Sequence, residues 1–219
     1  MTRQQILIAL IPVAYVIGSI PFGLMIGLAS GIDPRRAGSG NIGATNLGRL
    51  LGWKFFALVF TLDLLKGAAP TLAAGALLRF APGYRSGYLL WILVGAAAIT
   101  GHLFSLFLRF RGGKGVATST GVVLGIFPYF TAAGAVAIIV WLVVFRLTRY
   151  VSAGSIVGSL AFPVAYASIG AADGWPITGA QLPLLVFAIL MALLIIFKHR
   201  GNIARLRAGT ENRFAARNV

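Results

Sequence analysis

Residues 182–198 read LPLLVFAILMALLIIFK, a run whose only charged residue is its last, Lys198. About 20 predominantly apolar residues cross the hydrocarbon core of a bilayer as a helix, which satisfies its backbone hydrogen bonds internally. The same pattern predicts helices over 4–30, 53–78, 87–109, 116–129, 131–147 and 152–169. The sequence therefore predicts an all-α, polytopic membrane bundle of about seven transmembrane helices. The stretch 116–129 is short for a full crossing and could be a half-span or a re-entrant segment.

The composition agrees with a membrane protein. Of 219 residues, 58% are hydrophobic and 11% are charged, whereas soluble domains are about 45–50% apolar and about 25% charged. Cysteine is absent, which excludes disulfides, cysteine metal sites and a thioester acyl-enzyme. The first apolar stretch continues past Pro21 without a convincing cleavage site, so we interpret it as a retained helix rather than a signal peptide.

The basic residues predict the orientation. Seven crossings place the termini on opposite sides, and lysine and arginine gather on the cytoplasmic side of membrane proteins. One side holds Arg3, Arg79 and Arg85. The other holds Arg35, Arg36, Arg49, Lys54, Arg109, Arg111, Lys114, Arg146, Arg149, Lys198, Arg200, Arg205, Arg207, Arg213 and Arg217. We therefore expect an outer N-terminus and a cytoplasmic C-terminus. Because these charges separate apolar runs, the net charge of +15 favours a membrane surface or an anionic substrate over nucleic acid.

Three polar segments fall on the predicted cytoplasmic side, and the first is GIDPRRAGSGNIGATNLGRLLG at 31–52. Its glycines allow close approach of the backbone to a ligand, and its charges suit a phosphate. The alternative is a loop that only lets helices pack closely. The candidate residues are Ser39, Asn41, Thr45, Asn46 and Arg49.

The second segment is RFRGGKGVATS at 109–119. A glycine turn at Gly112, Gly113 and Gly115, the start of a helix and Lys114 together predict an anion cradle. It is not a Walker A loop, because Lys114 is followed by glycine and not by serine or threonine. The alternative is a basic turn that contacts lipid headgroups.

The third segment is FKHRGNIARLRAGTENRF at 197–214. A helix would present His199 and Asn202 on one face, and Glu211 is expected to form a salt bridge within the basic tail. Within the second predicted span, Asp63 and Lys66 lie three residues apart and can pair across one turn. Such a pair could serve function or hold helices together.

Several chemistries are disfavoured. The chain has no Gly-x-Ser-x-Gly elbow, neither histidine has an aspartate five residues on, and two distant histidines make a metal site poor. We predict no metal and no cofactor. A site rich in donors and cations but poor in nucleophiles suits a phosphorylated, already activated substrate.

The motifs resemble those of the bacterial acyl-phosphate-dependent glycerol-3-phosphate acyltransferases over nearly the whole chain. The matching segments are GSIPFG at 18–23, GSGNIGATN at 38–46 with Arg49, LDLLKG at 62–67, GGKGVAT at 112–118, RYVS at 149–152, HRGNI at 199–203 and GTEN at 209–212. The sequence departs mildly from the family pattern at Ser105, where proline is expected, and at Gly201, where a polar residue is common.

The resemblance implies a single acyltransferase domain over 1–219 in the bacterial inner membrane, with its site facing the cytoplasm. The expected reaction transfers an acyl group from acyl phosphate to the 1-hydroxyl of glycerol-3-phosphate, giving lysophosphatidic acid and phosphate in phospholipid synthesis. The substrate's own phosphate has been proposed as the base in such families, and we expect a functional monomer. By resemblance, the phosphate and donor sites are lined by Ser39, Arg49, Gly112, Gly113, Lys114, Gly115, Ser152, His199 and Asn202, and Glu211 is structural.

Two other functions are compatible with parts of the sequence. A small-anion transporter would account for the glycines and for Asp63 and Lys66, but the polar groups gather at one face and paired broken helices at mid-membrane depth are missing. A non-catalytic membrane scaffold would leave the three phosphate-suited segments unexplained.

Overall fold

A computed structural model describes residues 1–79 and 87–214, and within these ranges every regular element is helical, as predicted. The elements are α1 (Arg3–Ser19), α2 (Phe22–Ala29), α3 (Ala44–Leu51), α4 (Trp53–Arg79), α5 (Gly87–Leu103), the 3-10 turn η1 (Leu106–Leu108), α6 (Val116–Gly125), α7 (Thr131–Thr148), α8 (Val151–Ala172), α9 (Leu182–Lys198) and α10 (Arg200–Arg207).

Five helical stretches are long and apolar enough to cross a membrane: Arg3–Ala29, Trp53–Leu78, Gly87–Leu108, Thr131–Thr148 and Val151–Ala172. A sixth is reached if α9 and α10, which meet at a bend of 56°, form one span. All seven predicted segments thus contain an apolar helix, and the protein is a multi-pass membrane protein by length and composition. Because α6 is shorter than a span, the number of full crossings stays a prediction.

Some predicted boundaries were wrong. The helix expected over 4–30 is interrupted at Ile20 and Pro21, because proline has no N–H to donate to the preceding turn. The helix expected over 116–129 ends at Gly125, since Pro128 disfavours helical geometry in the residue before it. The helix expected over 87–109 ends at Leu103. Helices α3 and α10 were not among the predicted spans, because both are short and polar.

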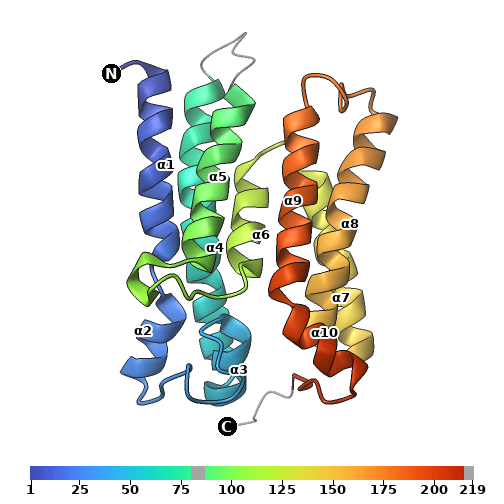
Figure 1. Cartoon of the computed structure of the whole chain (residues 1–219). Helices are drawn as coiled ribbons and strands as arrows, with labels where there is room; N and C mark the ends of the chain where they lie inside the picture. Colours follow the sequence, from blue (N-terminus) through green and yellow to red (C-terminus); the bar gives the residue numbers. More distant parts are fainter. Residues whose placement is uncertain (80–86, 215–219) are drawn as a thin grey trace.

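The helices form two groups with the site between them. Helices α1 to α6 lie on one side of the molecule and α7 to α10 on the other (Figure 1). Within the first group α1 packs on α5 and α4 on α6, and within the second α7 packs on α8 and α8 on α9. The N-terminus lies at one end of the bundle, whereas α3 and α10 lie at the opposite end (Figure 1).

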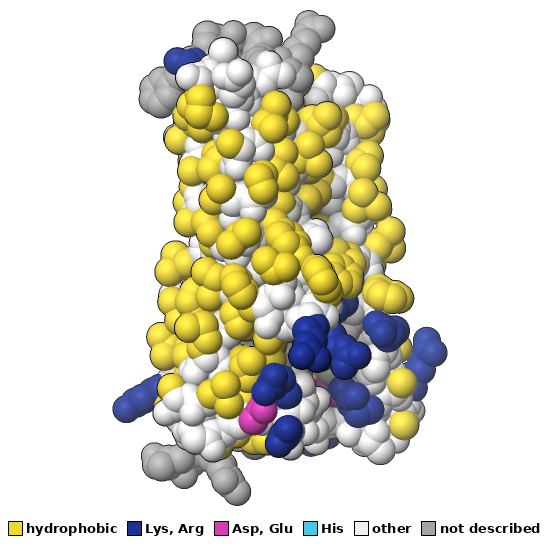
Figure 2. All heavy atoms as spheres, turned by 60° about the vertical axis from the view of Figure 1, so that its left-hand side comes forward, with side chains coloured by type: hydrophobic (Ala, Val, Ile, Leu, Met, Phe, Trp, Pro, Cys, Tyr) yellow, Lys and Arg dark blue, Asp and Glu magenta, His cyan; other side chains and the backbone are white. Residues whose placement is uncertain are grey.

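The surface shows the charge asymmetry that the sequence predicts. On the face shown in Figure 2, apolar side chains cover the wall of the bundle, and lysine and arginine gather at the end that carries α3 and α10. The side chain of Arg79 and all of Arg85 and Arg217 lie outside the described residues. We call the end with α3 and α10 the basic end.

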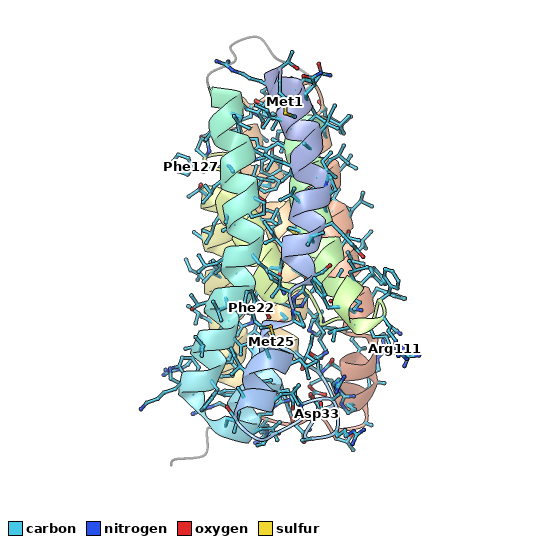
Figure 3. The ribbon with its side chains drawn as sticks, turned by 90° about the vertical axis from the view of Figure 1, so that its left-hand side faces the viewer. Met1, Phe22, Met25, Asp33, Arg111 and Phe127 are labelled. Carbon is cyan, nitrogen blue, oxygen red and sulfur yellow. The ribbon has the colours of Figure 1, made fainter. Side chains whose placement is uncertain are left out.

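The break between α1 and α2 is held by a buried ion pair. Lys66 Nζ donates to the carbonyl oxygen of Ile20 at 2.8 Å, and it lies 2.7 Å from Asp63 Oδ1, so the predicted pairing of these residues is confirmed. Lys66 also lies 5.8 Å from the ring of Phe22, at the start of α2 (Figure 3). The carbonyl that loses its helical partner at the break is thereby satisfied.

Serine replaces the expected proline at 105 without leaving a polar group unpaired. Ser105 Oγ donates to the carbonyl oxygen of Ser19 at 2.6 Å, where α1 ends. This bond joins the end of α5 to the end of α1, so the departure from the family pattern has a structural role.

Helices α6 and α4 pack closely at a crossing formed by glycines. A Cβ placed on Gly121 would lie 2.0 Å from the carbonyl oxygen of Leu64, and one on Gly67 would lie 2.2 Å from that of Thr118. No side chain can relieve such a clash with backbone, so α4 and α6 can approach this closely only with glycine at the crossing.

Gly121→Ala is expected to push α6 away from α4. The destabilisation should be about 2 kcal/mol, which lowers Tm by roughly 4–8 °C in a chain of this size. Thermal melting in detergent would measure it. Gly179→Ala is the matched control, because the nearest atom to its added Cβ is at 3.5 Å. Equal melting temperatures for the two variants would contradict a tight α4–α6 crossing.

Candidate active site

A cavity of about 560 Å³ lies between α4 and α6 on one side and α7, α8 and α9 on the other. At the basic end its wall is polar, and toward the middle of the bundle it becomes mostly apolar. Its polar lining comes from all three segments singled out in the sequence and includes Ser39, Asn41, Thr45, Asn46, Arg49, Asp63, His102, Lys114, Ser152, His199, Asn202 and Glu211.

Asn46 holds the first polar segment in shape. Its side-chain amide donates to the carbonyl oxygens of Pro34, Ala37 and Asn41 at 2.8–3.1 Å, and its Oδ1 accepts from the backbone N–H of Ser39 at 2.9 Å. A fully buried amide with these partners has little capacity left for a ligand. We therefore interpret Asn46 as the residue that presents Ser39 to the cavity rather than as a direct ligand.

Arg49 is the cation of this segment that faces the cavity. Its Nη2 donates to the carbonyl oxygen of Asn212 at 2.7 Å, which ties α3 to the C-terminal tail. Its Nε is buried and has no hydrogen-bond partner. A buried guanidinium N–H without a partner is costly, so this atom marks a place where an anion would be bound favourably.

Lys114 is positioned by a chain of hydrogen bonds that ends at Glu211. Its ammonium donates to Asn202 Oδ1, and Asn202 Nδ2 donates to Glu211 Oε1 at 2.6 Å. Ser152 donates to the same oxygen at 2.9 Å, and Arg205 pairs with Oε2 at 2.7 Å, which confirms the expected salt bridge. We call Lys114, Asn202, Glu211, Ser152 and Arg205 the Glu211 network.

The charges of the network are tuned by burial. Burial lowers the pKa of the Lys114 ammonium to about 8. Burial also raises the pKa of the Glu211 carboxyl, but hydrogen bonds from Asn202, Ser152 and Arg205 outweigh that effect and hold the pKa below its usual value. Glu211 therefore stays ionised, and its donors stay oriented.

The glycine turn before α6 differs from the predicted cradle. The N–H of Gly112 donates to the carbonyl of Leu103 and that of Gly113 to the carbonyl of His102, both at 3.1 Å. These donors satisfy the last carbonyls of α5, which otherwise lack partners, so they are not available to an anion. Gly115, with φ +86°, lets the chain turn into α6, and the start of that helix stands beside Lys114.

His199 lies between α9 and α10 and faces the cavity with one ring nitrogen. Its Nδ1 is 2.8 Å from the carbonyl oxygen of Ile195, which can only accept, so Nδ1 carries the proton. Burial, reinforced by the Lys114 ammonium, lowers the pKa of His199 to about 4. The ring is therefore neutral near pH 7, and its Nε2 is an acceptor.

A smaller pocket of about 360 Å³ adjoins the cavity at the basic end. It shares Ser39, Asn41, Lys114 and Asn202 with the cavity and is also lined by Gly112, Gly113, Lys198, Arg200 and Arg205. The last three were not among the predicted site residues. Their positions along the chain were visible in the sequence, but the bend of 56° between α9 and α10 was not.

The structure brings the predicted residues together with few exceptions. Gly112 and Gly113 line only the smaller pocket, and Lys66 lines neither, since it is used at the α1–α2 break. Asp63 reaches the cavity from its pair with Lys66, and His102 lies 3.7 Å from Asp63 and adjoins the glycine turn.

A family model described as glycerol-3-phosphate acyltransferase matches residues 8–209. The chain belongs to that family. It is 45% identical over 206 residues to the glycerol-3-phosphate acyltransferase of Geobacter sulfurreducens, covering 93% of this chain and 95% of that one. It is 41% identical to the Aquifex aeolicus protein of the same name, covering 92% and 95%.

Solved structures agree with this assignment. The chain is similar to PlsY (YgiH), an integral membrane glycerol 3-phosphate acyltransferase, in its glycerol 3-phosphate form. The TM-score is 0.81 and the identity 39%, over 95% of this chain and 96% of the other. The lysophosphatidic acid form gives a TM-score of 0.78 and 38% identity over 95% of each. The chain is thus an integral membrane acyltransferase of the glycerol-3-phosphate acyltransferase family, and its cavity is the candidate active site.

Proposed function

We propose that the protein transfers an acyl group from acyl phosphate to the 1-hydroxyl of glycerol-3-phosphate, giving lysophosphatidic acid and inorganic phosphate. The observation that carries this proposal is the cavity itself. Arg49 and Lys114 line its basic end, and from there the cavity continues as an apolar channel. Such a cavity suits one small anion and one amphiphile that meet where the wall changes character. The names of the relatives support glycerol-3-phosphate as the acyl acceptor.

The phosphates belong at the basic end. The unpartnered Nε of Arg49 and the ammonium of Lys114 can each donate a hydrogen bond to a phosphate. The adjoining pocket is also lined by Lys198, Arg200 and Arg205. Two phosphate groups must be held together there, which places several negative charges side by side. The cations offset that repulsion and bring the hydroxyl and the acyl carbonyl to reacting distance.

The acyl chain belongs in the apolar channel. From α4, α6 and α7 the lining includes Phe60, Leu124 and Ile138, and α7 also contributes Trp141 and Leu142. Leu124, Ile138 and Leu142 are also exposed on the wall of the bundle. The channel therefore opens toward lipid, from which an acyl donor would enter and into which the product would leave.

In the reaction the hydroxyl oxygen attacks the acyl carbonyl carbon, the ester C–O bond forms, and the bond between that carbon and the bridging phosphate oxygen breaks. The electron pair leaves with phosphate, so neither an acyl-enzyme nor a cofactor is needed. The hydroxyl proton goes to a phosphate oxygen, because the low pKa of His199 makes its Nε2 a weak base. His199 accepts a hydrogen bond from the hydroxyl and orients it.

Lys114 gives the reaction an expected pH dependence. Since its pKa is about 8 in the free protein, the ammonium is lost as the pH rises through that value. We expect KM for glycerol-3-phosphate to rise above about pH 8, and the rise to disappear in Lys114→Arg because guanidinium stays protonated. Initial rates across this range would measure it. An identical pH profile in Lys114→Arg would contradict the assignment.

The charge asymmetry supports a location and an orientation in the membrane. We propose a bacterial inner-membrane protein with its N-terminus outside and its basic end, including the active site, in the cytoplasm. The whole chain acts as one catalytic domain and functions as a monomer.

A test that separates catalysis from transport uses detergent. Purified protein in micelles is offered labelled glycerol-3-phosphate and acyl phosphate, and lysophosphatidic acid is measured. We expect product, since transfer needs no sealed compartment. No product in micelles, together with uptake of labelled anion into liposomes, would favour the small-anion transporter instead.

A further inference from the structure

We propose that a buried layer of aromatic side chains closes the far end of the channel and limits the length of the acyl chain that the enzyme accepts. The layer consists of Phe130, Phe162, Tyr166 and Phe187 with Ile126, and we call it the channel floor. This inference rests on the proposed function, because it assigns the selectivity of the same site.

Four helices stop lining the cavity at the same level. The lining residues farthest from the basic end are Val123 and Leu124 on α6, Gly134 on α7, Phe162 on α8 and Met191 on α9. One turn farther along, the corresponding residues are Ile126, Phe130, Tyr166 and Phe187, of which none lines the cavity. The first three are 0% exposed and Phe187 is 8% exposed. The channel therefore ends at a continuous packed layer.

The floor is built to stay in place. The ring of Phe130 meets Phe162 edge to face at 5.0 Å and Tyr166 at 5.2 Å, and it is parallel to Phe187 at 6.4 Å. Tyr166 is anchored in turn, because its hydroxyl donates to Gln181 Oε1 at 2.8 Å. Rings locked on several sides cannot swing aside for an added methylene without straining the core.

The distance from the reacting end to the floor is set by α8. Ser152 belongs to the Glu211 network and Phe162 to the floor, and ten residues of one helix span about 15 Å. Both ends of the channel are thus fixed to one rigid element. A chain that is too long must leave through the lipid-facing side or pull its carbonyl away from the phosphate site.

Two substitutions should change the length of the channel in opposite directions. Phe162→Ala removes the ring that the channel reaches first and lengthens the apolar space. Gly134→Ala does the reverse, since its Cβ would lie 2.5 Å from Val123 Cγ1, and the two side chains then crowd the end of the channel. Because the variants act in opposite directions, a general loss of stability cannot imitate both.

The test compares kcat/KM for dodecanoyl, hexadecanoyl and octadecanoyl phosphate, each at the same mole fraction in mixed micelles. We expect Phe162→Ala to raise the ratio of the longest to the shortest donor about tenfold, and Gly134→Ala to lower it. Leu184→Ala is the matched control, because it removes a fully buried side chain from α9 two turns beyond Met191 and outside the channel. Its ratio should match that of the wild type.

Unchanged ratios in both Phe162→Ala and Gly134→Ala would overturn the inference while leaving the proposed function intact, since the wild type and both variants would still use acyl phosphate. If Phe162→Ala does not fold, Gly134→Ala alone decides, by the fall in its ratio. The proposed function fails separately, if the wild type transfers no acyl group from any of the three donors.

Discussion

Lys114→Ala is expected to lower kcat/KM for glycerol-3-phosphate by about a hundredfold, the effect of losing one charged hydrogen bond of about 1.5–3 kcal/mol. The fold should survive, because Lys114 lies in the turn before α6 and its hydrogen-bond partner Asn202 keeps its own bond to Glu211. Arg49→Ala is expected to act in the same direction, since it removes the second cation that lines the cavity.

Initial-rate kinetics measure the expected loss of kcat/KM, and thermal melting in the same detergent measures whether the fold survives. Lys54→Ala is the matched control, because that lysine is exposed near the start of α4 and lines neither pocket. Wild-type kinetics in both Lys114→Ala and Arg49→Ala would remove the proposed anion site.

Glu211→Ala should disable the protein through both stability and activity. Its carboxylate accepts from Asn202 and Ser152 and pairs with Arg205, so its removal leaves buried donors without partners. We expect a loss of about 3 kcal/mol in the free energy of unfolding. Activity should fall further than stability, because Asn202 is no longer held where it orients Lys114.

The variant Glu211→Gln separates the two contributions. Its amide oxygen can still accept from Asn202 and Ser152, but the charge that pairs with Arg205 is lost, so both effects should be smaller than in Glu211→Ala. Melting curves and initial rates would be compared side by side. A fully stable and active Glu211→Ala would show that the network does not hold the site.

The sequence was most informative where hydrophobicity alone decides the structure. Apolar runs such as 182–198 predicted the helices, and the count of basic residues predicted the end at which the site lies. The Asp63–Lys66 pair and the Glu211 salt bridge were also predictable, because Asp63 and Lys66 lie one helical turn apart and Glu211 is the only carboxylate in a basic tail.

Other features depend on tertiary packing that spacing does not reveal. The N–H groups of Gly112 and Gly113 are used by the end of α5, an interaction between segments whose contact the sequence does not specify. The amide of Asn46 is likewise used to hold a loop. Arg205 meets Glu211 because the chain doubles back after α10, which the sequence does not reveal.

The choice of acyl donor tests the proposed reaction most directly. Detergent-purified protein would receive labelled glycerol-3-phosphate with acyl phosphate, acyl-CoA or acyl carrier protein as separate donors. We predict lysophosphatidic acid from acyl phosphate alone, because the site offers the cations Arg49 and Lys114 for a phosphate leaving group. Product formed equally well from acyl-CoA, or no product from any donor, would contradict it.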